Sequence, residues 1–176
     1  MGKSTFDGPV RSLNGFFAQG PGNIINIADG TNTLTLDVAT YAGRMIMTND
    51  ASLIITLPTI NTSTDASAGP GTGPNTLNNQ GADFFFFIET AATAVAIKTD
   101  GTDKFVGSIL MVATDAAGAT TGYAPAASND VINLNGTTTG GAAGSWIWIK
   151  ATKALKYRVE GVLLGSGLVA TPFADA

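Results

Sequence analysis

The chain has 176 residues, no cysteine and no histidine, and its 9 basic and 13 acidic residues give a formal net charge of −4. The missing residue types exclude thiolate and imidazole chemistry, including Ser-His-Asp catalysis and zinc sites built on Cys or His. The acidic balance argues against nucleic acid or an anionic membrane surface as the main partner, since both reward clustered Lys and Arg.

Residues 1–22 are predicted to form an extended arm. They are rich in Gly, Pro, Ser and Asn, and they carry interleaved apolar side chains at Phe6, Val10, Leu13, Phe16 and Phe17. The start has no apolar run of the length that a signal peptide needs, and no apolar stretch of 18 residues occurs anywhere. We therefore expect a protein that is not routed through a membrane.

Short β-type runs separated by turn residues fill the rest of the chain. They are residues 23–27, 33–38, 44–48, 52–57, 83–89, 94–98, 107–112, 130–134, 145–150 and 155–164. Asp-Gly or Asn-Gly pairs at 28–32, 99–103 and 134–141 favour the positive-φ turns that close hairpins. The pattern predicts one all-β domain over residues 23–176, an antiparallel β-sandwich of jelly-roll type or a barrel.

A polar, Gly- and Pro-rich segment interrupts the runs at about residues 58–83. It is too long for a hairpin turn, so we expect either a mobile surface loop or an arm held by a partner. A linker between two domains is conceivable. One domain is favoured, because the first half alone has too few strands to close a core.

The stretch GADFFFFIET, residues 81–90, has apolar side chains on both faces of one strand. Successive side chains alternate, so Phe84, Phe86 and Ile88 share one face while Phe85, Phe87 and Glu89 share the other. We assign the first face to the core. Since a carboxylate tolerates an interface rim better than a core, Phe85 and Phe87 are candidates for contact with a second copy of the chain or an adjacent sheet.

The run SWIWIK repeats this two-faced pattern, with Trp146 and Trp148 opposite Ile147 and Ile149. Exposed paired tryptophans would indicate sugar stacking, but a buried strand is favoured. The neighbouring LKYRVE supports a buried strand because it alternates Leu155, Tyr157 and Val159 inward with Lys156, Arg158 and Glu160 outward.

Motifs that could carry chemistry are weak. GKST at 2–5 is similar to the end of a phosphate-binding loop, but the upstream glycine and strand are missing. Asp100 and Asp103 could offer oxygens to a hard cation, although the loop supplies few ligands and a hairpin turn is favoured. No catalytic residue, cofactor site or metal site is predicted.

Four segments resemble small virion proteins of tailed bacteriophages. These are GPVRSLNGF (8–16), ASLIITLP (51–58), DKFVGSILM (103–111) and NGTTTGGAAGSWIWIKATKALKYRVEGVLLGSGLVATPF (135–173), and the family is that of capsid decoration, or cement, proteins, particularly those of marine phages. The resemblance implies a β-rich homotrimer, made in the host cytoplasm, that lies on the outer capsid surface and ties major capsid proteins together. It makes the arm a capsid-gripping element through Phe6, Pro9, Val10, Arg11 and Phe16, without active-site residues.

Two alternatives stay open. One is the head domain of a tail fibre or spike that binds a host-surface receptor or glycan, which an exposed cluster of Trp and Tyr beside polar loops would favour. The other is an enzyme that uses Asp and Glu alone, for example on polysaccharide. A concave carboxylate pair would be its mark.

Overall fold

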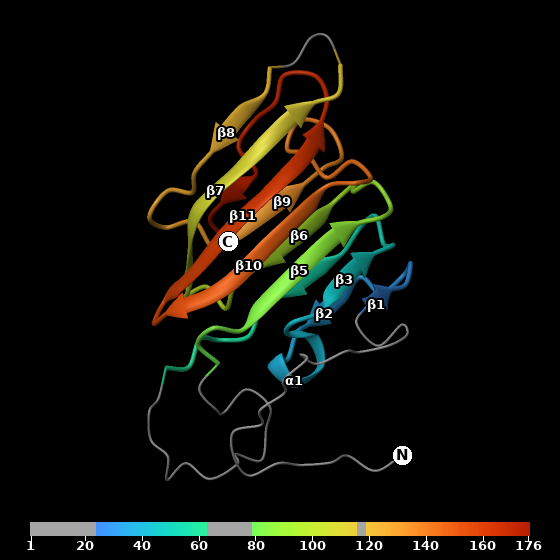
Figure 1. Cartoon of the computed structure of the whole chain (residues 1–176). Coiled ribbons are helices and arrows are strands. Elements are labelled where there is room, and N and C mark those ends of the chain that lie inside the picture. The colour runs from blue at the N-terminus through green and yellow to red at the C-terminus, as the bar shows by residue number, and fades with distance from the viewer. Residues whose placement is uncertain (1–23, 63–78, 116–118) are drawn as a thin grey trace, which may run out of the picture.

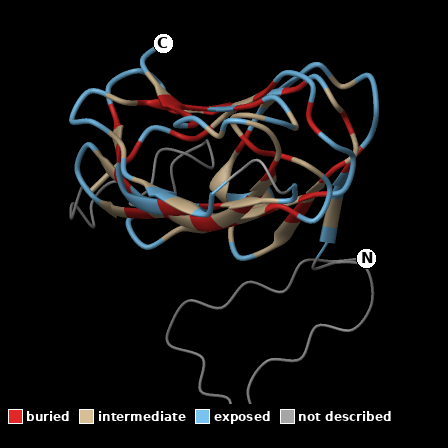
Figure 2. Cartoon of the chain, turned by 90° about the horizontal axis from the view of Figure 1, so that it is seen from above, coloured by how far each residue is buried: buried red, intermediate tan, exposed pale blue. Residues whose placement is uncertain are grey.

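The computed structural model describes residues 24–62, 79–115 and 119–176. These residues form a sandwich of two β-sheets with the buried side chains between them (Figures 1 and 2). The larger sheet contains, in spatial order, β1 (Ile24–Ile27), β3 (Met45–Thr48), β5 (Asp83–Ile88), β10 (Trp146–Lys153), β11 (Lys156–Gly165), β7 (Lys104–Ala113) and β8 (Thr121–Tyr123). The smaller sheet contains β12 (Phe173–Ala174), β9 (Val131–Leu134), β6 (Val95–Lys98), β4 (Ile54–Thr56) and β2 (Thr33–Thr35). The predicted all-β, sandwich-like fold is confirmed, and neither sheet closes into a barrel.

Both sheets are mixed, so the expectation of an antiparallel sandwich was wrong in this respect. The chain alternates between the sheets from β1 to β7, and the pairs β1/β3, β3/β5, β2/β4 and β4/β6 are parallel. Antiparallel neighbours can be joined by a hairpin, whereas parallel neighbours need a crossover. Here each crossover is a strand of the opposite sheet. β7 and β11 are also parallel, and every antiparallel pair includes at least one of the strands β8 to β12.

The turn at residues 28–32 illustrates how the chain changes sheets. Gly30 and Asn32 have positive φ values of +80° and +59°, in the left-handed region that the Asp-Gly pair predicted. The backbone N–H of Asn32 donates to the Asp50 carboxylate at 3.0 Å. The turn therefore joins β1 of one sheet to β2 of the other. The turns at 99–103 and 134–141 also join the two sheets, so none of the three closes a hairpin.

The core lies between the inner faces of the two sheets. From the larger sheet come fully buried side chains at alternating positions, as a strand with one buried face requires. They include Ile46, Phe84, Phe86, Ile88, Ile147, Ile149, Tyr157 and Val159, and they meet Ile55, Ile97 and Ile132 of the smaller sheet. This packing determines which residues lie on the outer face of the larger sheet, because the two neighbours of each inward-pointing residue point outward.

The two ends of the polar segment at 58–83 are held together at its base. Asn79 is buried; its backbone N–H donates to the Asn61 carbonyl at 3.0 Å, and its side-chain amide donates to the Thr59 carbonyl at 2.8 Å. The Asn79 side-chain oxygen accepts the Asn61 N–H at 2.8 Å. Residues 63–78 lie outside the described part of the chain. In both sheets a strand that precedes the segment pairs with a strand that follows it: β3 pairs with β5, and β4 pairs with β6.

Candidate interaction surface

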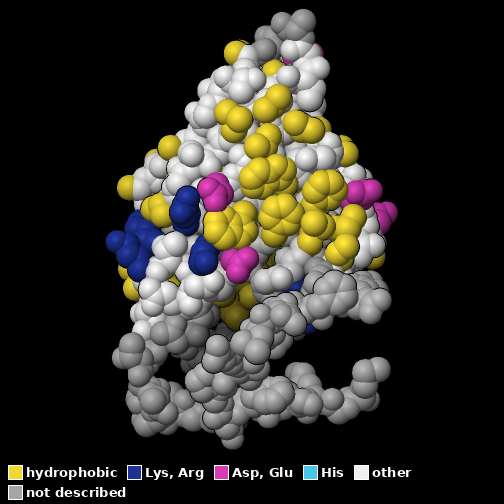
Figure 3. All heavy atoms as spheres, viewed as in Figure 1, with side chains coloured by type: hydrophobic (Ala, Val, Ile, Leu, Met, Phe, Trp, Pro, Cys, Tyr) yellow, Lys and Arg dark blue, Asp and Glu magenta, His cyan; other side chains and the backbone are white. Residues whose placement is uncertain are grey.

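The outer face of the larger sheet carries two cross-strand rows of large side chains. One row runs Met47, Phe87, Trp146, Val162 and Leu110, and the other runs Met45, Phe85, Trp148, Glu160 and Ser108. We call the eight apolar members of these rows the aromatic face: Met45, Met47, Phe85, Phe87, Trp146, Trp148, Val162 and Leu110. The space-filling view shows them as one contiguous apolar area over the middle of the sheet (Figure 3).

The aromatic face is about as large as the largest apolar patch on a typical soluble monomer. At a strand spacing of ~4.8 Å and ~7 Å between outward residues of one strand, the two rows cover about 300 Å² before side-chain relief is counted. The largest apolar patch on a typical soluble monomer is of this order, and such patches often serve binding. Leu110 at the end of one row is 43% exposed.

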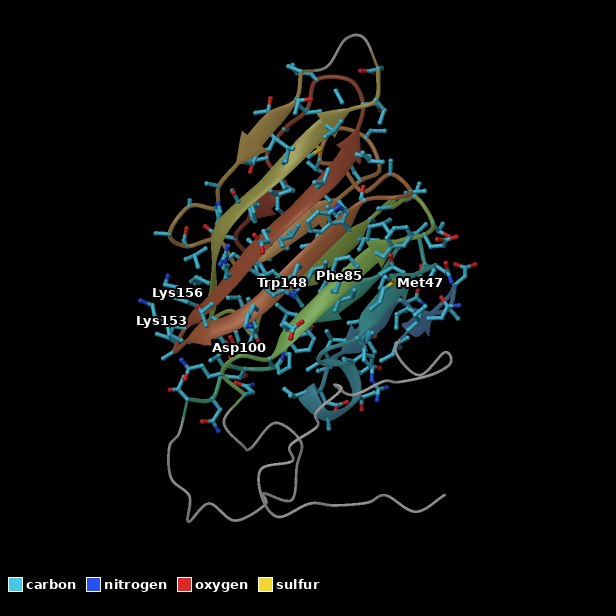
Figure 4. All side chains as sticks on the ribbon, viewed as in Figure 1. Met47, Phe85, Asp100, Trp148, Lys153 and Lys156 are labelled. Carbon is cyan, nitrogen blue, oxygen red and sulfur yellow. The ribbon has the colours of Figure 1, made fainter. Side chains whose placement is uncertain are left out.

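Ring contacts give the aromatic face a fixed shape. The rings of Phe85 and Trp146 stack with centroids 5.9 Å apart and an interplanar angle of 23°. The indole N–H of Trp148 donates to the Asp83 carboxylate at 3.1 Å, and the Lys150 ammonium lies 5.6 Å from the Trp148 ring centroid. Figure 4 shows Phe85, Trp148 and Met47 side by side on neighbouring strands. Ordered aromatic side chains lose little entropy when a partner covers them.

Charged side chains border the aromatic face at one end. Arg158 and Glu160 form an exposed ion pair with a nitrogen–oxygen distance of 3.2 Å, and Asp83 and Lys150 lie beside Trp148. An apolar centre with a polar rim is the usual anatomy of a protein–protein interface.

The structure separates the two faces of the phenylalanine run as the sequence predicted. Phe84 and Phe86 have no exposed surface and belong to the core, which confirms that assignment. Phe85 and Phe87 are half-buried on the outer face, and the smaller sheet packs on the opposite side. Within residues 24–62, 79–115 and 119–176, therefore, no second sheet of the same chain covers Phe85 and Phe87. Contact with a second copy stays a prediction.

Two sequence-based assignments on the β10–β11 hairpin need correction. Ile147 and Ile149 are buried, but Trp146 and Trp148 are only partly covered, because the tryptophan side of β10 is the outer side of the sheet. Leu155 was expected to point inward with Tyr157 and is instead 51% exposed. It occupies the turn with a φ of +64°, and the alternation of β11 begins only after it.

Asp100 and Asp103 lie close in the turn from β6 to β7, and backbone N–H groups hydrogen-bond to both carboxylates. Asp100 accepts the backbone N–H groups of Thr102 and Asp103 at 2.8 and 3.0 Å, an arrangement that organises the turn. Asp103 is fully buried and accepts the Ile60 N–H at 2.8 Å. Desolvation raises the pKa of Asp103, and the nearby Asp100 adds to the shift. Within the described ranges, no three Asp or Glu residues group as metal ligands would.

The remaining candidates fall outside the described residues. They are Phe6, Pro9, Val10, Arg11 and Phe16 of the arm and the GKST stretch at 2–5. Sequence reasoning also missed members of the aromatic face, namely Met45, Met47, Val162 and Leu110. The signal that could have revealed them is the alternation in RMIMT, GSILMV and EGVLL, which leaves large apolar side chains on the side away from the core.

Comparison of the chain with protein-family models, curated proteins and solved structures found no match. Among the residues that the structure places, no helix is long and apolar enough to cross a bilayer; α1 (Val38–Tyr41) has four residues.

Proposed function

We propose that the chain is a non-enzymatic structural protein that assembles through the aromatic face. The observation that carries this proposal is the pair of cross-strand rows that leaves Phe85, Phe87, Trp146 and Trp148 at the surface of a rigid sheet. Because these side chains are half-buried, each one left in water forfeits part of the about 1.5 to 3 kcal/mol that full burial contributes. Aromatic residues and Met are also enriched at interfaces, where few residues contribute most of the binding free energy.

The resemblance of the sequence to phage virion proteins suggests where this assembly takes place. We propose a capsid decoration protein of a tailed phage, a homotrimer that binds the outer surface of the major capsid protein shell and stabilises it. Binding to the assembled shell and not to free subunits stabilises the shell by mass action, without a catalytic group. In this proposal the arm with Phe6, Pro9, Val10, Arg11 and Phe16 contacts the capsid, and Phe85 and Phe87 contact another subunit.

The subunit interface is tested by truncating its aromatic side chains. Phe85→Ala and Phe87→Ala should leave the protomer β-rich while its sedimentation mass falls with dilution. Leu168→Ala is a matched control, because Leu168 is 87% exposed and lies outside the aromatic face. If both Phe variants sediment as the full oligomer at sub-micromolar concentration and only melt at lower temperature, the aromatic face is not the subunit interface.

The capsid contact is tested by removing the arm. Deletion of residues 2–17 should leave a folded oligomer, since the sandwich begins at β1, and that oligomer should no longer bind phage heads in co-sedimentation. A truncated protein that still saturates the particles would show that the arm is not the anchor.

A second candidate function is recognition of an uncharged host-surface ligand such as a glycan. It is favoured by a shallow hollow of about 470 Å³ at the surface of the smaller sheet. The floor is apolar and includes Ile54 and Ala96, and the polar groups around it are neutral, at Asn133, Asn135 and Thr139. Glycan-array binding that is lost in Asn133→Ala and unchanged in Phe85→Ala would favour this function over assembly.

A further inference from the structure

The basic residues of the described part gather at one end of the strands, where Asp83, Asp100, Asp103 and Asp130 also lie. All seven basic residues of the described part lie at one end of the sandwich: Arg44, Lys98, Lys104, Lys150, Lys153, Lys156 and Arg158. The register places them together, because Lys156 pairs with Lys104 and with Lys153, while Lys150 pairs with Arg158 and with Asp83 at the start of β5. We call the β10–β11 turn with Lys153, Leu155 and Lys156 the basic tip (Figure 4).

The opposite end of the sandwich carries acidic residues and, among the residues described, no basic ones. β1, β3, β5 and β7 all run toward this end, and each is followed by an acidic residue. We call these residues, Asp29, Asp50, Glu89 and Asp115, the acidic end. Backbone N–H groups of Asn32 and Ser52 hold the pKa of Asp50 below its usual range, so this carboxylate stays ionised although it is buried.

One copy of the chain cannot bring its basic tip to its own acidic end. β11 has ten residues and runs from the basic tip to the far end, a distance of about 33 Å at ~3.3 Å per residue. That distance is several times the Debye length of about 8 Å at physiological ionic strength. The attraction between the two ends is therefore satisfied only between different copies.

The groups at both ends are available for such a contact. Lys104 is paired with Asp130 at 2.7 Å and Arg158 with Glu160, but Lys153 and Lys156 form no ion pair with any described residue. Asp29 and Glu89 are exposed and likewise form none within the described ranges. Leu155 lies between the two lysines in the sequence and is half exposed. A partner surface with negative charge complements the two lysines.

We propose that the basic tip of one copy docks on the acidic end of a second copy, head to tail. The inference rests on the proposed self-assembly and adds to the aromatic face a second contact, between the two ends of the sandwich. A head-to-tail contact joins two different patches, so repeating it closes a ring or extends a filament. A three-fold ring needs a contact of this kind, because its subunits cannot meet through one self-complementary patch. Complementary charges also steer association and exclude wrong orientations.

Charge reversal tests the contact. Two double variants reverse the charges of one end each: Lys153→Glu/Lys156→Glu and Asp29→Lys/Glu89→Lys. Each should weaken self-association about tenfold or more in sedimentation equilibrium, because it brings like charges together at the contact. The chain with all four substitutions has both charges exchanged, and it should associate within about threefold of the unmodified chain. Lys98→Glu is a control for position: it reverses one lysine at the same end, where the double variant reverses two, but it lies on the smaller sheet. Association of the unmodified chain should weaken as NaCl is raised.

The outcomes separate this contact from the proposed function. Normal association of both double variants, or no recovery in the fourfold variant with a native circular dichroism spectrum, overturns the head-to-tail contact and leaves the aromatic face untouched. Loss of phage-head binding in Lys153→Glu/Lys156→Glu at unchanged mass would assign the tip to the capsid and also overturn it. A monomeric unmodified chain at all concentrations contradicts both proposals.

Discussion

Asp103 lies where ionisation is costly. Its side chain has no exposed surface, one carboxylate oxygen accepts the Ile60 N–H, and the other has no partner among the described residues. The nearby Asp100 adds like charge, and Tyr157, whose pKa burial raises, offers no positive charge to compensate. An ionised carboxylate in such a place destabilises the folded chain relative to the unfolded chain.

This environment predicts an unusual pH dependence of stability. Because the folded chain holds the Asp103 proton more tightly than the unfolded chain, the free energy of unfolding should rise as the pH falls from neutrality toward the ordinary value of 3.8. Asp50, Asp100 and Asp130 have lowered pKa values, so the stability they contribute is lost only as the pH falls below 3.8. Urea unfolding at several pH values should therefore give a maximum near pH 4.

Asp103→Asn identifies the residue responsible. The amide oxygen can still accept the Ile60 N–H, but the group no longer titrates, so the free energy of unfolding should vary less between about pH 4 and pH 7. If the unmodified chain and Asp103→Asn give parallel pH profiles in this window, the buried carboxyl is not the source of the dependence.

Tyr157 anchors the start of the polar segment. Its buried hydroxyl donates to the Pro58 carbonyl at 2.5 Å. Tyr157→Phe keeps the ring and leaves that carbonyl without its donor, so the free energy of unfolding should fall by about 1 to 3 kcal/mol in chemical denaturation. The outer-face variant Val162→Ala serves as a control for altered packing on the same strand. A decrease in the free energy of unfolding below about 0.5 kcal/mol would mean that water replaces the Tyr157 hydroxyl as donor to the Pro58 carbonyl.

At the scale of single strands, the two faces of β5 should respond differently to truncation. Phe84→Ala removes a fully buried ring and should cost about 3 to 5 kcal/mol of unfolding free energy. Phe85→Ala removes a half-buried ring from the outer face and should cost the monomer clearly less. Denaturation at a concentration where the chain is monomeric measures both, and equal losses would contradict the two-faced assignment.

The ten predicted runs all correspond to strands, because alternation and turn residues are local signals. The sequence analysis missed β8 (Thr121–Tyr123) and β12 (Phe173–Ala174), which have three and two residues and show no period of their own. It also missed the parallel pairing. Gly30, Gly101 and Gly136 all adopt the expected positive φ, but a tight turn does not record whether the next strand joins the same sheet or the opposite one.

For the candidate surface, the sequence revealed Phe85 and Phe87 through the side-chain period, since no single core accounts for both faces of one strand. It could not reveal the rows that these residues complete. Met47, Trp146, Val162 and Leu110 come from four strands, of which only β10 and β11 are consecutive in the sequence, and the register aligns them. The separation of basic and acidic ends is likewise a property of the assembled sheets.

At the scale of the whole molecule, the segment 63–78 should be dispensable for folding. Its flanks already meet, because Asn79 donates to the Asn61 carbonyl at the base. Replacing residues 63–78 by two glycines shortens a closed loop, and loop length changes stability by only about 0.6 kcal/mol per doubling. The thermal unfolding midpoint should therefore stay close to that of the full chain, and loss of the cooperative transition would contradict this.

The alternation of strands between the two sheets has a consequence for the order of folding. β5 pairs with β3, which is synthesised earlier, and with β10, which is synthesised much later. β6 likewise pairs with the earlier β4 and the later β9. A ribosome therefore releases β5 and β6 before their antiparallel partners exist, and the first six strands are all paired over long sequence separations. The β10–β11 hairpin is a local pairing that can form early, so folding should begin near the end of the chain that is made last. High φ-values in β10 and β11, with low ones in β1 to β4, would record that order.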